Sequence, residues 1–301
     1  MQAVQPVKTQ RASRSTLNAF SFGTIASGVK NHVFGTWLLV YYNQVLGLDP
    51  AQAGLALALA LVVDAIIDPL IGVWSDRVHT RWGRRHPFMY AGILPFALSF
   101  YALLQPPTDL SQNSLFFRLL FLTIAVRVSM GLYEIPRGAL GPELTKDYDQ
   151  RTQMVGWSTA YGWFGGAGFA WLILAFLLPE TAEYPGSRAF LNPVGYRHMA
   201  WIGGLLIFAT SMISTVSLHH HIPNLHVPAI DSDMKFNLQK LKREIIETLS
   251  NRSWLVLFAA GLVFALYVGL HSNTDRYYDL YFWQWTPDRV QIFRLSIWSL
   301  P

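Results

Sequence analysis

Seven long apolar stretches dominate this sequence, and each is close to the roughly 20 residues that an α-helix needs to cross a bilayer. Lipid offers the backbone no hydrogen-bond partners, so stretches of this kind fold as membrane-spanning helices. The stretches cover residues 20–46, 53–75, 88–104, 114–138, 154–178, 198–217 and 253–282. An eighth begins after Pro287, and the chain ends at Pro301. The sequence therefore predicts an all-α polytopic membrane protein.

The composition agrees with a membrane location. Only 14% of the residues are charged and 52% are hydrophobic, whereas soluble domains carry about 25% charged residues. The net charge of +5 comes from Lys and Arg in short loops between apolar stretches. We therefore expect a lipid bilayer as a partner and no nucleic acid. The absence of cysteine excludes disulfides and thiolate metal sites.

The distribution of Lys and Arg among the loops predicts the orientation. Loops 47–52 and 105–113 contain neither residue. Lys and Arg are concentrated in residues 1–19, 76–87, 139–153 and 218–252. Positively charged loops remain on the cytoplasmic side, so we expect a cytoplasmic N-terminus in a plasma or bacterial inner membrane.

The order of the segments indicates the domain organisation. Six helices, a longer loop and a further helix are the layout expected from a transporter built of two repeats. Residues 235–250 of the loop place apolar side chains on one helical face, which predicts an interfacial helix; a charged linker is the alternative. The expected parts are a leader at 1–19, a six-helix bundle at 20–217, a linker at 218–252 and the start of a second bundle at 253–301.

Two carboxylates interrupt the second apolar stretch. Asp64 and Asp68 are four residues apart, so they lie on the same face of a helix. A carboxylate at the centre of a membrane helix costs about 2.5–3.5 kcal/mol on insertion scales, which favours a functional role. Glu134 is a third such acid, and it closely precedes Pro136, which frees a backbone carbonyl one turn back. Neighbouring buried acids repel unless they share a proton or a cation, so these three predict a cation-binding site.

The alternative is that these acids only bridge helices. Lys30 and Arg127 are the expected balancing charges for Asp64 and Asp68, and Arg127 or Arg137 for Glu134. Lys30 is itself ambiguous, because it could fill a cation's place, pair with an acid or extend to the interface.

The sequence shows no enzyme signature. HExxH, P-loop and GxSxG motifs are missing, and the adjacent histidines 219–221 do not converge on one metal ion. We therefore expect no enzymatic activity, no metal site and no cofactor apart from a coupling ion. Polar residues on the helices are instead candidates for solute contacts: Asn31, His32, Tyr133 and Asn273.

Several motifs resemble the glycoside–pentoside–hexuronide:cation symporters of the major facilitator superfamily, which include melibiose permease and plant sucrose carriers. They are DAIIDPLIG at 64–72, SDR at 75–77, RWGRRHPF at 81–88, YYNQVLGL at 41–48 and EIP at 134–136. The resemblance implies a twelve-helix carrier that works by alternating access. Asp64 and Asp68 would match its cation-site carboxylates, with Glu134 an acidic site position on helix four. The turn after the second helix would be its cytoplasmic gating loop, with Asp76, Arg77, Arg81, Gly83, Arg84 and Arg85.

The sequence departs from melibiose permease at sites of sugar and ion binding. Gly28 replaces a sugar-binding acid, and Gly138 and Thr159 replace a Trp and an Arg near the sugar. Ile67 stands where the cation site has an Asn, which favours protons over sodium. The expected function is proton-coupled symport of a glycoside-like solute, which the resemblance implies is a carbohydrate; a lipid-like or other non-sugar solute is the alternative.

The chain is shorter than a twelve-helix carrier. Because solute sites form between two halves, we expect this polypeptide to be incomplete alone, or to self-associate. A non-transporting remnant, sensor or assembly partner is the alternative from a different functional class.

Overall fold

The computed structural model describes residues 11–78, 80–107, 109–222, 243 and 247–298. The first span comprises α1 (Arg14–Phe22), α2 (Thr24–His32), the π-helical turn η1 (Val33–Trp37), α3 (Leu38–Val40) and a second π-helical turn η2 (Tyr41–Val45). The following spans are α4 (Pro50–Arg77), α5 (His86–Leu103), α6 (Gln112–Leu144), α7 (Tyr148–Leu172) extended by η3 (Ile173–Leu177), and α8 (Pro193–His219). A short 3₁₀ helix, η4 (Gly186–Leu191), precedes α8. The chain continues with α10 (Arg252–Tyr277), η6 (Tyr278–Phe282) and α11 (Pro287–Trp298).

The predicted all-α membrane architecture is confirmed. Each of the seven apolar stretches forms helix over most of its length, and an eighth helix starts at Pro287. Five of the described helices are long and apolar enough to span a membrane. On α10 no residue of the most apolar window is buried in this chain, as expected for a helix that faces lipid.

The structure differs from the sequence prediction at the first helix, which begins at Arg14, inside the stretch expected to be a leader. Ser13 caps this helix by accepting a hydrogen bond from the backbone N–H of Thr16. Leu17 and Phe20 are buried in a small apolar cluster with residues of α6, α7 and α8. The interfacial helix predicted at 235–250 lies almost entirely outside the described residues; 247–250 are helical.

Polar caps and prolines mark where the spans begin. Asp49 accepts hydrogen bonds from two backbone N–H groups at the start of α4, and Pro50 follows it. Asn192 and Pro193 repeat this arrangement at α8. Proline suits the first turn because it lacks an N–H that the helix would leave unpaired. These local signals explain why the spans start close to the predicted positions.

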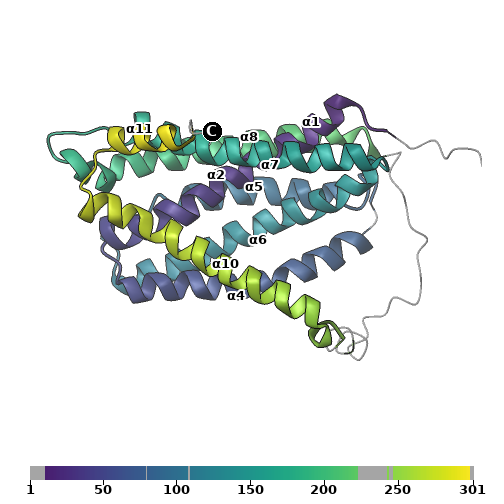
Figure 1. Cartoon of the computed structure of the whole chain (residues 1–301), viewed down its shortest axis with the longest axis horizontal. Helices are drawn as coiled ribbons and strands as arrows, with labels where there is room; N and C mark the ends of the chain where they lie inside the picture. The colour runs from purple at the N-terminus through teal and green to yellow at the C-terminus, as the bar shows by residue number, and fades with distance from the viewer. Residues whose placement is uncertain (1–10, 79, 108, 223–242, 244–246, 299–301) are drawn as a thin grey trace, which may run out of the picture.

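The helices pack as a bundle around α2, α5 and α6. The adjacent pairs include α5 with α6 and α8, α4 with α6, and α2 with α7 and α8. Figure 1 shows α7, α8 and α11 along one side and α4 and α10 along the other. The contact of α2 with α7 is close because glycines form it: a Cβ on Gly28 would lie 2.0 Å from the carbonyl oxygen of Gly162.

The loops gather at two ends of the bundle. At the first, here called the basic end, the turn after α4 lies with the start of α1 and the junction of α6 and α7. Arg11 pairs with Asp147 at 2.9 Å there, and Thr16 hydrogen-bonds His221 at 2.9 Å. At the other, the distal end, Gln112 donates to the carbonyl oxygen of Gly47. The described residues of the basic loops around α1, after α4 and between α6 and α7 thus share one end of the structure.

Candidate functional site

The first element of the site is an ion pair between α4 and α6. Arg127 donates a 2.7 Å hydrogen bond to Asp64. Both side chains are largely buried, with exposed fractions of 17% for Arg127 and 23% for Asp64. Of the two balancing charges that the sequence left open for Asp64, the structure places Arg127 against it. Removing one partner of a shielded ion pair leaves the other charge buried without compensation, which is strongly destabilising.

Asp68 lies one helical turn from Asp64 but has a different hydrogen-bonding environment. Its Oδ1 is buried and has no hydrogen-bond partner among the described residues. The oxygen faces α6 at Gly131, where a Cβ would lie only 2.8 Å from it. An unpaired buried acceptor costs about 1–3 kcal/mol. Asp68 therefore offers a carboxylate oxygen that a proton or a cation would stabilise.

Glu134 connects α6 to the first span. Its carboxylate accepts a hydrogen bond from the hydroxyl of Ser27. Arg137, one turn further along α6, lies 3.8 Å from the same carboxylate and donates to the carbonyl oxygen of Phe20. The structure thus assigns Arg137, rather than Arg127, to Glu134.

Lys30 completes the set that we call the charged cluster: Asp64, Asp68, Glu134, Lys30 and Arg127. Lys30 is 6% exposed and lies within electrostatic range of the other four. Its ammonium donates to the side chain of Asn31 at 3.3 Å and sits 4.8 Å from the ring centre of Phe34. The structure therefore brings together the five residues that the sequence predicts for ion binding and charge balance.

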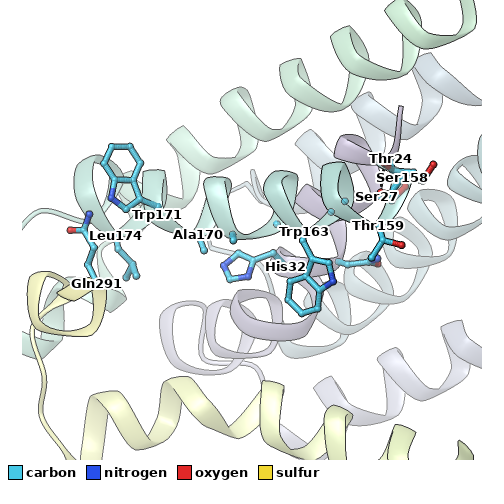
Figure 2. Close-up of a pocket in the computed structure, with 15 residues that line it drawn as sticks. Thr24, Ser27, His32, Ser158, Thr159, Trp163, Ala170, Trp171, Leu174 and Gln291 are labelled. Carbon is cyan, nitrogen blue, oxygen red and sulfur yellow. Dashed lines mark hydrogen bonds between the residues drawn. The ribbon is translucent and has the colours of Figure 1, made fainter. Parts of the chain in front are cut away.

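A cavity of about 750 Å³ opens beside the charged cluster, between α2 and α7, with Gln291 of α11 also in its lining. Figure 2 shows hydroxyl side chains at one end of it and the rings of His32 and Trp163 near its middle. Volumes of this size suit small organic ligands. Hydroxyl, amide and imidazole groups can hydrogen-bond a polyol, and indole rings can pack on its apolar faces.

Side chains on α2 join this cavity to the charged cluster. Ser27 lines the cavity and donates to Glu134. Asn31 lines the cavity and accepts from Lys30. A ligand that displaced either hydrogen bond would change the surroundings of a charged group, so binding in the cavity and ionisation in the cluster are physically linked.

The solute residues expected from the sequence fall into two groups. Asn31 and His32 line the cavity. Tyr133 is fully buried and donates to the carbonyl oxygen of Gly23. Asn273 donates to Gly269 in its own helix. The structure therefore does not bring Tyr133 and Asn273 to the cavity wall.

The predicted gating loop forms a tight turn at the basic end. Thr80 and Gly83 exchange two backbone hydrogen bonds, and Gly83 has φ of +76°, a conformation that favours glycine. Arg84 and Arg85 both bind Glu143 at the end of α6, at 2.9 and 3.0 Å.

Asp76 is the second acid of this network. Its carboxylate lies 3.3 Å from Arg85 and 4.0 Å from Arg84. Arg81 stacks over Trp82 instead, and Arg77 is the last residue of α4. The turn therefore ties α4 to α6 through salt bridges.

The sequence predictions missed Ser27 and Glu143. A hydroxyl among small residues carries no signal of its own until a carboxylate is placed beside it. Glu143 had a weak signal, because a turn rich in arginine with one acid needs further carboxylates nearby.

The comparisons with known proteins assign the family. The sequence profile described as MFS/sugar transport protein matches residues 19–298. The chain belongs to this family. Among its relatives, an uncharacterized symporter of Synechocystis is 31% identical over 60% of this chain and 34% of its own length.

Several relatives of this family member have names that specify a solute. The isoprimeverose transporter of Lactiplantibacillus pentosus is 24% identical over 87% of this chain and 52% of its own length. The glucuronide carrier protein homolog of Escherichia coli is 30% identical over 58% of this chain and 37% of its own length. The chain spans about a third to a half of the length of these curated relatives.

Proposed function

We propose that this family member is a proton-coupled symporter of a glycoside-like solute, with the proton at Asp68 and the solute in the cavity between α2 and α7. The observation that carries the proposal is the unpartnered buried Oδ1 of Asp68, in a charged cluster that shares Ser27 and Asn31 with the cavity. The family and the names of its relatives support transport and a sugar-like solute.

The arrangement of the acids supports a proton as the coupling ion. Asp64 is engaged by Arg127 and Glu134 by Ser27 and Arg137, so the three carboxylates have different partners. A hard metal cation takes several oxygen ligands at once, whereas a proton needs one carboxylate oxygen. Protonation of Asp68 would remove the cost of leaving its charge without a partner.

The mechanism follows from the link through α2. A proton on Asp68 lowers the net negative charge of the cluster, which alters the balance around Lys30 and Glu134. Solute hydroxyls that bind Asn31 or Ser27 act on those same two groups from the cavity side. Joint binding then favours release of the salt bridges at the basic end, which we propose faces the cytoplasm in agreement with the positive-inside pattern.

The test measures proton uptake that accompanies solute binding. The chain in lipid nanodiscs is titrated with isoprimeverose, sucrose and phenyl glucuronide by calorimetry, in buffers of different ionisation enthalpy, and uptake is followed in proteoliposomes. We expect one probe to bind with uptake of about one proton near neutral pH, because a single carboxylate takes it up. Asp68→Asn should abolish the coupling.

The matched control is Asp49→Asn, the same substitution on the same helix. Asp49 caps α4 through backbone N–H groups, and asparagine caps a helix as well as aspartate does. The control should keep coupled binding. Equal proton coupling in Asp68→Asn and in the unmodified chain would refute the assignment of the proton to Asp68.

A further inference from the structure

His32 reaches the cavity from a widened turn of the first span. It immediately precedes the π-helical turn η1, where Leu38 donates its backbone N–H to the carbonyl oxygen of Val33, five residues back. In a regular α-helix, residues five apart are about 140° apart around the axis and do not face each other. A π-helical turn has more residues per turn, and such turns are frequent at functional sites.

The widened turn brings two side chains five residues apart into contact. The indole nitrogen of Trp37 donates a 3.1 Å hydrogen bond to Nε2 of His32. Indole is a donor only, so the Nε2 that accepts this bond carries no proton. A neutral imidazole in this position therefore holds its proton on Nδ1. Trp37 thus determines both the orientation of the ring and which nitrogen donates.

The indole itself is held from several sides. Trp37 is fully buried, with Phe190 and Tyr196 at ring-centre distances of 6.0 and 6.2 Å. The guanidinium of Arg276, at the end of α10, lies 4.9 Å from its ring centre. Arg276 is in turn bonded to Asp279 at 2.6 Å. A ring packed in this way has little freedom to rotate, so the direction of its N–H is set by the fold.

We propose that Trp37 is a positioning residue for the solute site, which fixes His32 as an Nδ1–H donor toward a solute acceptor oxygen. This inference rests on the proposed role of the cavity as the solute site. It extends that proposal because Trp37 itself does not line the cavity and acts only through His32.

The first experiment measures the tautomer without any solute. The full chain is labelled with ¹⁵N in its histidine rings and studied by NMR in nanodiscs, and His32→Asn identifies the signal of residue 32 among the nine histidines. The unmodified chain should show Nδ1 protonated. Trp37→Phe keeps a ring beside Arg276 but removes the N–H, so the Nε2-protonated form should appear.

Tyr196→Phe is the matched control for loosening of the aromatic cluster. It removes a buried hydroxyl beside the same indole, one that donates to Phe190 and not to His32. It should leave the tautomer unchanged. A proton on Nε2 in the unmodified chain would overturn the inference. So would the same tautomer in Trp37→Phe and in the unmodified chain.

The second experiment measures binding of isoprimeverose, sucrose and phenyl glucuronide. Asparagine at position 32 places its amide near the former Nδ1, and glutamine places it near the former Nε2. Trp37→Phe and His32→Gln should weaken Kd by about threefold to tenfold, the worth of one hydrogen bond, and His32→Asn by about twofold at most. Adding Trp37→Phe to His32→Asn should change nothing further.

The two experiments separate the inference from the proposed function. Equal losses in the Asn and Gln variants, or additive losses in the double variant, would contradict the positioning role. Failure of all three probes to bind the unmodified chain would refute the proposed solute class, and the tautomer measurement would still decide whether Trp37 orients His32.

Discussion

Glu143 holds the turn at the basic end together, and its replacement by glutamine should weaken the fold measurably. The carboxylate accepts a 2.9 Å hydrogen bond from Arg84 and forms a 3.0 Å ion pair with Arg85. The exposed fractions are 17% for Glu143 and 12% and 10% for the two arginines. Water therefore screens this network far less than it screens a surface pair.

The expected loss of stability follows from this hydrogen bond and this ion pair. A hydrogen bond to a charged group contributes about 1.5–3 kcal/mol net. Glutamine keeps an acceptor oxygen but loses the charge, and Asp76 remains nearby with 55% of its side chain exposed. We therefore expect Glu143→Gln to lower the free energy of unfolding by about 2 kcal/mol.

The assay is equilibrium unfolding in detergent micelles, with Glu247→Gln as the matched control. Glu247 pairs with Arg243 at 2.7 Å, with exposed fractions of 61% and 82%. Exposed pairs of this spacing contribute about 0.3–0.5 kcal/mol. If Glu143→Gln cost no more than this control, the argument that burial strengthens the network would be wrong.

Three further changes have defined outcomes. Gly28→Ala should separate α2 from α7 and cost about 1–3 kcal/mol in unfolding free energy, because its Cβ would meet a backbone carbonyl at 2.0 Å. Gly156→Ala, also in a helix but with open space around the Cβ, should be neutral or stabilising; equal effects would argue against the close approach. Asp147 accepts the N–H of residue 150 and pairs with an arginine, which together lower its pKa. The stabilisation that this carboxylate gives the folded state is therefore fully present above the unfolded-state pKa of about 4. It is lost as pH falls through the lowered pKa of the folded state. In Asp147→Ala this acid-dependent loss of thermal stability should disappear, and an unchanged pH profile would contradict the assignment. Arg276→Lys keeps the charge but loses the planar contact with Trp37, so hydrogen exchange across the end of α10 should accelerate; unchanged exchange would show that the stacking does not hold this helix.

The charged residues show how far local spacing reaches. The i,i+4 spacing of Asp64 and Asp68 places both on one face of α4 in any environment. Spacing alone does not distinguish them, yet one is bonded to Arg127 and the other has an unpartnered oxygen. The difference arises because α6 presents a guanidinium at one level and Gly131 at the next. Such a pairing depends on the rotation and depth of two packed helices.

The sequence by itself determined the helical spans and the class of membrane protein, because a bilayer requires apolar stretches of about 20 residues with internal hydrogen bonds whatever their neighbours are. Tertiary structure alone decided the partners: Glu143 for the arginine turn, Ser27 for Glu134 and Trp37 for His32. The first two contacts join helices far apart in the chain, and the third needs a π-helical turn in place of a regular α-helical one. Each depends on the positions of whole segments in space, which residue spacing along the chain does not specify.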